Sequence, residues 1–308
     1  MIFSPHGLVF KSANAGDFLN DKPVGIIGDI ILDRILSIDH FPRKGSEAFV
    51  TGGSERLGGS ACNTARMIRK LGITPLLVAC YADDEAGRQI SERLNRHGLD
   101  RTYIKENGQK SGVIYILVTP DSERTMITSR SDNPIPLEAS VYDALLERIS
   151  WLHVSGYTLT EQSQKAIVHK VLEKANQMNI TVSLDPGTGT VLNYASDLLQ
   201  ILPRVDYFLP NEEEYEILNK NTEFDKIIKR SGNPLIIKRG QKGARIRFSQ
   251  SVKDIEPGRK VSVTDTTGAG DAFNAGFIAR MVKSRDPETA CSEANEAAGK
   301  WIESTVFL

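Results

Sequence analysis

The chain has 308 residues, of which 40% are hydrophobic and 25% are charged, and its formal net charge at pH 7 is −1. This length and apolar content allow a large core in one or two domains. Acidic and basic residues are interspersed, which argues against a nucleic-acid-binding surface and against a polybasic membrane patch.

The chain shows neither a membrane segment nor a cysteine framework. No apolar run approaches the roughly 18 residues that a membrane-spanning helix needs. Residues 1–22 lack the charged-then-apolar order of a secretory signal, and we expect them to form a disordered tail. The three cysteines, Cys62, Cys80 and Cys291, are far apart, which favours reduced thiols over disulfides or a zinc site. These features predict a cytoplasmic protein.

The first part of the chain mixes strands, turns and helices. Apolar residues at helical spacing predict helices, and short apolar runs bounded by turn residues predict strands. In chain order we expect a buried strand at 24–32, short strands and turns at 35–56, a helix at 60–71, a strand at 76–81, a helix at 85–97, and a hairpin with strands at 113–118 and 125–129.

From residue 137 onward, helices and strands alternate regularly. We expect a helix from 137, a strand at 151–154, a helix at 161–178, a strand at 181–184, a helix near 197, a strand at 207–209, strands at 234–239 and 245–248 joined by a glycine turn, and helices from 268 to about 282 and at 287–302. Such alternation predicts a parallel sheet with helices on both faces. No linker is visible, so we expect one α/β domain over 1–308.

The most informative segment is Gly268-Ala269-Gly270-Asp271, directly before a helical pattern. The first turn of a helix presents unpaired N–H groups and a partial positive charge, and glycines let an anion approach them. A carboxylate beside such an anion hole suits a base that deprotonates a hydroxyl while phosphate charge is stabilised. The alternative for Asp271 is a simple helix cap.

Two familiar nucleotide motifs are excluded. A dinucleotide fingerprint needs a third glycine where Phe273 stands, and a Walker loop needs Gly-Lys-Ser/Thr, which the chain lacks. A hydride-transferring oxidoreductase is therefore disfavoured, because Gly25-Ile-Ile-Gly28 followed by Asp29 is not a dinucleotide motif.

The segment 265–277 resembles the C-terminal signature of the PfkB/ribokinase family of sugar kinases, and Gly58-Gly59-Ser60-Ala61-Cys62-Asn63 resembles its N-terminal motif. Weaker matches follow in family order from residue 24 to 303. The resemblance implies a ribokinase-like three-layer α/β/α fold with a mostly parallel central sheet. It also implies a small β-sheet lid over the sugar, made by the segments 34–57 and 105–130.

The resemblance implies a role for each of several residues. Asp271 would be the base, and the amides of Gly268, Ala269 and Gly270 the anion hole. The residues implied to hold the sugar are Asp33, Gly58, Gly59 and Asn63. Alternatives are a turn cap for Asp33 and an ordinary polar helix residue for Asn63.

The same resemblance implies ATP and Mg²⁺ as cofactors. The residues implied at the nucleotide are Asn211, Glu214, Gly240, Gly243 and Asn295, with Glu214 reaching Mg²⁺ through water. Asp265 and Thr267 lie where many family members bind K⁺. For Asn211-Glu-Glu-Glu214 the alternative is a solvated helix start.

The predicted activity is transfer of the γ-phosphate of ATP to a hydroxymethyl group of a small sugar. Alternatives are a nucleoside kinase of the same superfamily and a binding protein that has lost catalysis. A sugar-phosphate kinase is disfavoured by Leu209-Pro210-Asn211, where that branch tends to carry Lys-Pro-Asn. We expect Arg130, near the end of the second lid segment, to be an exposed charge, and the alternative is that it faces an anionic substrate. We expect no nucleic-acid or membrane partner, and a homodimer through edge strands of the lid.

Overall fold

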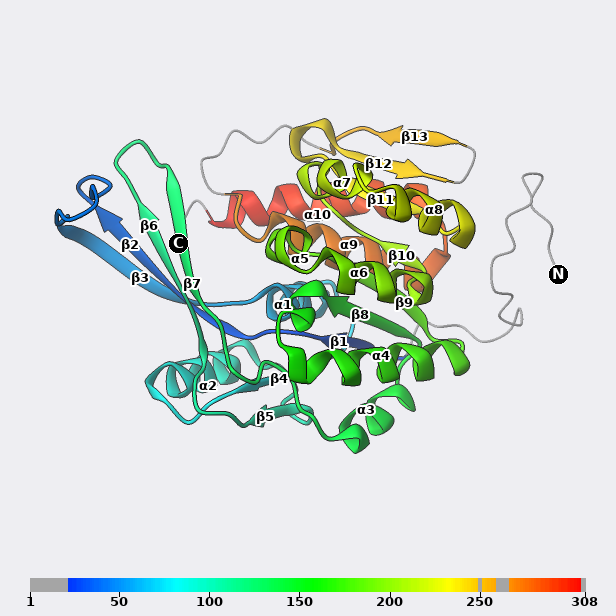
Figure 1. Ribbon diagram of the computed structural model, residues 1–308, viewed down its shortest axis with the longest axis horizontal. Helices are drawn as coiled ribbons and strands as arrows, with labels where there is room; N and C mark the ends of the chain where they lie inside the picture. Colours follow the sequence, from blue (N-terminus) through cyan, green and yellow to red (C-terminus); the bar gives the residue numbers. More distant parts are fainter. Residues whose placement is uncertain (1–21, 249–250, 259–265, 306–308) are drawn as a thin grey trace.

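The computed structural model describes residues 22–248, 251–258 and 266–305 (Figure 1). Residues 1–21 of the predicted tail and the predicted potassium-site residue Asp265 lie outside the described residues. None of the helices in the described ranges combines the length and the apolar character needed to cross a membrane.

The main sheet has nine strands in the order β13-β12-β11-β10-β9-β8-β1-β4-β5. These are β1 (Val24–Ile27), β4 (Pro75–Tyr81), β5 (Ile104–Glu106), β8 (Trp151–Ser155), β9 (Thr181–Asp185), β10 (Tyr207–Phe208), β11 (Leu235–Lys238), β12 (Ala244–Arg247) and β13 (Val252–Ile255). The strands from β5 to β11 pair in parallel, whereas β12 and β13 pair antiparallel. The expected mostly parallel sheet is confirmed.

Helices cover both faces of this sheet, as Figure 1 shows. They are α1 (Ser60–Lys70), α2 (Glu85–His97), α3 (Ala139–Leu146), α4 (Gln162–Gln177), α5 (Thr188–Asn193), α6 (Ala195–Ile201), α7 (Glu212–Asn219), α8 (Thr222–Ser231), α9 (Ala269–Ser284) and α10 (Pro287–Thr305). Successive strand residues point to opposite faces, so Ile26 packs in a core with Phe277 of α9, and Ile27 in a second core with Phe224 of α8. The three-layer arrangement follows from these two cores.

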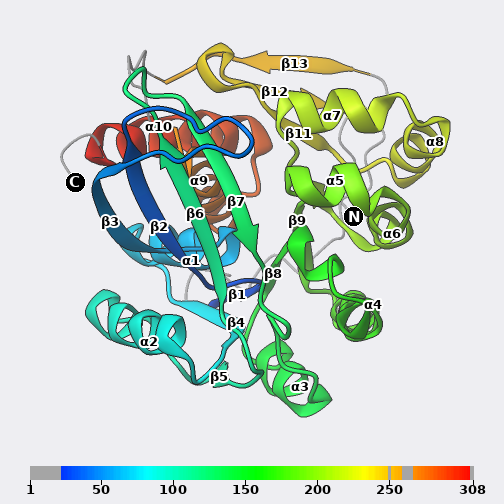
Figure 2. The ribbon, with the colours of Figure 1, turned by 60° about the vertical axis from the view of Figure 1, so that its left-hand side comes forward.

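A second, four-stranded sheet has the order β3-β2-β6-β7, and Figure 2 shows its strands side by side. Its strands are β2 (Ile31–Ile38), β3 (Val50–Gly58), β6 (Gly112–Val118) and β7 (Arg124–Ser129). We call this sheet the lid. It projects from the main body in Figure 1 and is built from the two segments that were expected to form it.

The prediction of one strand over 24–32 is wrong. The main-sheet strand ends at Ile27, and the lid strand begins at Ile31. Asp29 lies buried between them, and its carboxylate accepts a hydrogen bond from the amide of Ala61 at 3.5 Å. Gly28 and Asp29 interrupt the apolar run at this place, but periodicity did not show that the chain passes from one sheet to the other there.

Candidate active site

Asp271, in the first turn of α9, lies against the first turns of α1. One of its carboxylate oxygens accepts a hydrogen bond from the Ser60 hydroxyl at 2.8 Å, and the other from the Asn63 amide at 3.0 Å. The two sequence motifs, more than 200 residues apart, therefore meet at one carboxylate.

Burial raises the pKa of Asp271 to about 7, and the negative charge of Asp185 acts in the same direction. The hydrogen bonds from Asn63 and Ser60 oppose this shift, as does the charge of Lys238. A carboxyl group with this pKa is ionised in a large fraction of molecules at neutral pH and still basic enough to take a proton.

The turn before α9 has the geometry expected of a helix N-terminus. Gly268 caps the helix with a left-handed φ of 80°, and the amide of Ala269 donates to the carbonyl of Thr266 at 3.0 Å. The indole of Trp301 in α10 donates to the carbonyl of Thr267 at 2.8 Å. A Cβ on Gly268 would lie 2.8 Å from that indole nitrogen, so Gly268 is required by close packing as well as by conformation.

A buried ion pair lies beside this turn. The ammonium of Lys238, at the end of β11, lies 2.7 Å from the Asp185 carboxylate and donates to the Asn274 side-chain oxygen at 3.4 Å. It also lies 3.6 Å from the place where a Cβ on Gly270 would sit. Although burial alone would lower the pKa of Lys238, the charges of Asp185 and Glu214 raise it, so the site holds a permanent cation.

Asp33 extends from β2 and is almost fully buried. Burial raises its pKa, although the Arg56 guanidinium lies 3.2 Å away and opposes the shift. A Cβ on Gly58 would lie 2.4 Å from the Asp33 carboxylate, and one on Gly59, where φ is 95°, would lie 2.6 Å from the Asp29 carbonyl. The absence of a side chain therefore lets the Asp33 carboxylate approach Gly58 and the backbone at Asp29 approach Gly59.

Asn211 and Glu214 form the capping box of α7. The Asn211 side chain accepts from the Glu214 amide, and the Glu214 carboxylate accepts from the Asn211 amide, both at 2.8 Å. The other Glu214 oxygen accepts from the Thr188 hydroxyl at 2.9 Å. Glu214 is 3% exposed, so this helix start is not solvated at that residue. Burial and the charge of Asp185 raise the pKa of Glu214.

The remaining nucleotide candidates gather next to β12 and β13. Gly240 and Gly243 bound a short turn after β11 and have φ values of 55° and 78°. The turn at Gly243 lies against the backbone of residues 255–257, and the Asn295 side chain donates to the Glu256 carbonyl at 3.0 Å. The three residues thus border one region, between the turn and α10.

Of the two residues predicted to bind potassium, only Thr267 is described, and both of its oxygens accept hydrogen bonds. The Thr267 hydroxyl accepts a hydrogen bond from Arg124 of the lid at 3.1 Å, and its carbonyl is bound by Trp301. Within the described residues no group of three or more His, Cys, Asp and Glu side chains could hold a metal ion.

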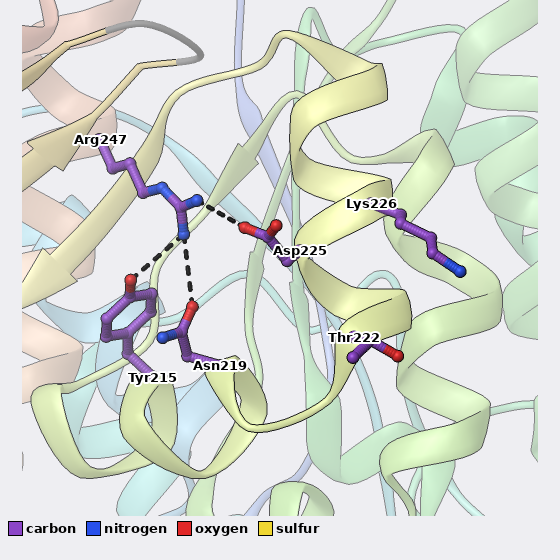
Figure 3. Close-up of a pocket in the computed structure, with 6 residues that line it drawn as sticks. All are labelled: Tyr215, Asn219, Thr222, Asp225, Lys226 and Arg247. Atoms are coloured by element: carbon purple, nitrogen blue, oxygen red, sulfur yellow. Dashed lines mark hydrogen bonds and ion pairs between the residues drawn. The ribbon is translucent and has the colours of Figure 1, made fainter.

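A separate surface depression of about 560 Å³ lies between α7, α8 and β12 (Figure 3). There Arg247 donates to the Tyr215 hydroxyl at 3.2 Å, to Asn219 at 3.4 Å and to Asp225 at 2.6 Å. None of the predicted site residues lines it, and its arginine is held by the protein, so we assign the function elsewhere.

Several residues that contact the predicted site residues were not themselves predicted from the sequence to belong to the site. The Ser60 hydroxyl lies inside the glycine motif, and Lys238 ends an apolar strand just before Gly240, so both positions carried a signal. Asn274 lies inside the segment 265–277 and so carried a signal as well. Arg56 had none, since its contact with Asp33 depends on a chain segment far away in sequence.

A model described as pfkB family carbohydrate kinase matches residues 22–305. The ribokinase of Bacillus subtilis (strain 168) is 25% identical over 280 residues, covering 90% of this chain and 92% of that protein. The ATP-dependent ribose-1-phosphate kinase of Halopiger xanaduensis is 28% identical over 278 residues, covering 87% and 88%. A structure of Burkholderia thailandensis nucleoside kinase in complex with inosine superposes with a TM-score of 0.74 at 23% identity, covering 91% of each chain. The predicted fold is confirmed.

Proposed function

The chain belongs to the pfkB family of carbohydrate kinases, and from that premise we propose that it transfers the γ-phosphate of ATP to a hydroxymethyl group of a small sugar, with Asp271 as the base. At the coarser level the family and its relatives indicate an ATP-dependent kinase of a sugar or a nucleoside. The observation that supports the finer proposal is the Asp271 carboxylate, hydrogen-bonded by Ser60 and Asn63 at the start of α9.

The acceptor hydroxyl would lie between Asp271 and the lid. Asp33 and Asn63 can bind sugar hydroxyls, because a carboxylate accepts from two donors and an amide both donates and accepts. Asp271 would then take the proton of the attacking hydroxyl. The amides of Gly268 and Gly270 and the Lys238 ammonium, 3.6 Å from a Cβ on Gly270, would meet the charge of the transferred phosphoryl group. The Ala269 amide, also predicted for this role, instead donates to the Thr266 carbonyl.

Mg²⁺ would be held through water near Asn211 and Glu214. Both Glu214 oxygens already accept one hydrogen bond each and retain a further lone pair, which fits an indirect role and not direct ligation. When bound, the metal would neutralise phosphate charge. Gly240, Gly243 and Asn295 would border the nucleotide. We do not extend the proposal to K⁺, because Asp265, the other residue predicted there, lies outside the described residues.

The direct test is a panel of neutral sugars and nucleosides, with ADP release and the phosphorylated product measured. We expect ATP-dependent phosphorylation of a sugar. Turnover of nucleosides alone would replace the sugar by a nucleoside as acceptor. Only a lack of acceptor-dependent turnover with neutral sugars, charged sugars and nucleosides alike would leave a binding protein.

The activity should depend on pH through Asp271. With the pKa of this group at about 7, kcat/KM for the sugar should fall at acidic pH, to about one-tenth of its plateau at pH 6. The Ser60 hydroxyl stabilises the charged form, so Ser60→Ala should raise the pKa of Asp271 and move the acidic limb to higher pH. A pH–rate profile measures both, with exposed Ser292→Ala of α10 as the control. If the acidic limb of the pH–rate profile does not move in Ser60→Ala, the Ser60 hydroxyl does not influence the pKa of the base.

The lid also supports a proposal about assembly. Its exposed apolar side chains are Phe41, Phe49, Val50, Met126 and Ile127, each more than half exposed. The apolar lid residues Ile38 and Val113 are buried and do not contribute to this exposed surface. A thin sheet with exposed apolar residues and open edges favours pairing with a second copy. We expect light scattering at micromolar concentration to give a dimer, and Phe49→Ser to shift it toward monomer. A strict monomer would refute this assembly.

A further inference from the structure

Three arginines lie on one side of the lid. Asp33 and Arg56 are directly opposite in the register of β2 and β3, and Thr128 of β7 is in register with them through Ile114 of β6. Side chains alternate along a strand, so Arg124, four residues before Thr128 in β7, has the same orientation. Arg130 follows directly after β7, and its guanidinium lies 3.9 Å from Asp29. We call this side the inner face, because Arg124 reaches Thr267 at the start of α9.

Arg130 differs from its neighbours in what it binds. Arg56 donates to Asp33, Arg124 to Thr267, and Arg66 of α1 to the Leu57 carbonyl and to Asn63. Over residues 22–248, 251–258 and 266–305, the Arg130 guanidinium donates no hydrogen bond. Its nearest acid is Asp29, with 3.9 Å between the nitrogen and the oxygen, which is beyond hydrogen-bond distance.

The Arg130 guanidinium is nevertheless held in place. Its central carbon lies 4.0 Å from the centre of the Tyr157 ring, and the side chain is 29% exposed. Stacking on an aromatic ring fixes the plane of a guanidinium and leaves its in-plane N–H groups available at the edge. Arginine has five donors and no acceptor, and the Arg130 side chain is 29% exposed, so its N–H groups are available to a ligand.

The position of Arg130 is next to the proposed acceptor site. Tyr157 follows β8 and contacts Gly187 after β9, and Asp29 follows β1, so the stack lies at the carboxyl ends of three adjacent strands. Asp29 accepts from the amide of Ala61, whose neighbour Ser60 binds Asp271. One short run of contacts therefore joins Arg130 to the proposed base.

We propose that Arg130 binds an anionic group of the acceptor, so that the substrate class is a sugar that carries a phosphate or a carboxylate. This inference rests on the proposed function and specifies its acceptor. Both groups match the forked donors of arginine, which bind two oxygens at once. In the sequence, a sugar phosphate was disfavoured because Leu209 is uncharged. Leu209 is fully buried, so its identity is explained by core packing and is not evidence about the charge that the lid presents to a substrate.

The first experiment compares matched acceptors on the full chain with ATP and Mg²⁺. The probes are ribose and inosine as neutral acceptors, ribose 1-phosphate for the phosphate arm, and gluconate for the carboxylate arm. We expect one of the two charged probes to have the highest kcat/KM. If it is ribose 1-phosphate the anionic group is a phosphate, and if it is gluconate the anionic group is a carboxylate. Equal or better use of neutral acceptors would overturn the inference while leaving the proposed kinase function intact.

The second experiment changes the arginine. Arg130→Met should raise KM for the preferred charged acceptor by roughly 10- to 100-fold, with little change in KM for ATP, because charge-assisted hydrogen bonds are lost. Arg130→Lys should recover part of the affinity. Arg230→Met, at an exposed position of α8, is the matched control. If Arg130 served only to neutralise Asp29, Arg130→Met would lower Tm and weaken all acceptors alike, which would overturn the inference.

A binding measurement separates the two proposals. Calorimetry without ATP should show ribose 1-phosphate or gluconate binding to the wild-type chain and to Arg230→Met, and not to Arg130→Met. That result supports the anion site even if no probe is phosphorylated, an outcome that would count against the kinase assignment alone. Binding that is equal in the wild type and Arg130→Met, or absent in both, refutes the anion site.

Discussion

Asp271→Asn is expected to lower kcat roughly 100- to 10,000-fold while sugar binding is largely retained. The amide has the shape of the carboxylate and still accepts a hydrogen bond from Ser60 or Asn63, but it cannot take the proton of the acceptor hydroxyl. Steady-state kinetics measures the loss, and calorimetric titration with the sugar measures the binding.

The matched control is Asp83→Asn, an exposed carboxylate just before α2 that pairs with Arg88 at 3.5 Å. It removes the same charge from the chain at a place outside the proposed site. A kcat for Asp271→Asn close to that of the control would remove Asp271 from the role of base, whatever its effect on binding.

Asp33→Ala is expected to weaken the sugar by on the order of 2–5 kcal/mol, because two charge-assisted hydrogen bonds are lost. The KM for ATP should change little, since the nucleotide candidates Gly240, Gly243 and Asn295 lie near β12 and α10 and not at the lid. Initial-rate kinetics with each substrate varied in turn gives both values.

Arg56→Ala tests whether the effect comes from the sugar or from the ion pair. It breaks the same 3.2 Å contact but keeps the Asp33 carboxylate, so its effect on sugar KM should be much smaller than that of Asp33→Ala. Equal losses in the two variants, or equal weakening of ATP and sugar by Asp33→Ala, would show that Asp33 acts on the fold.

The sequence by itself determined the features that depend on neighbouring residues. The alternation after residue 137 predicted the parallel sheet, and the two strand-rich insertions predicted the lid, because period and turn residues are local properties. The glycine turn before Asp271 predicted a helix N-terminus, which the structure has at Gly268. Strands β5 and β13 and helix α8 were missed, since they are short or largely polar.

The sequence predicted which residues form the candidate site better than it predicted which of them contact one another. The contacts of Ser60 and Asn63 with Asp271 could be expected only from the family resemblance, since these residues stand in its two motifs. For Asn211 and Glu214, pattern alone left a solvated helix start open, whereas the fold buries Glu214 beside Thr188. Their roles at magnesium remain predictions.

Tertiary structure alone decided the charges of the site. Lys238 and Asp185 are 53 positions apart, and only the pairing of β9, β10 and β11 brings them to 2.7 Å. The pKa of Asp271 rises because the fold buries it near Asp185, and Arg130 is fixed because the lid places it over Tyr157. Desolvation, charge proximity and stacking all depend on distances between remote segments, which one sequence read along its length does not contain.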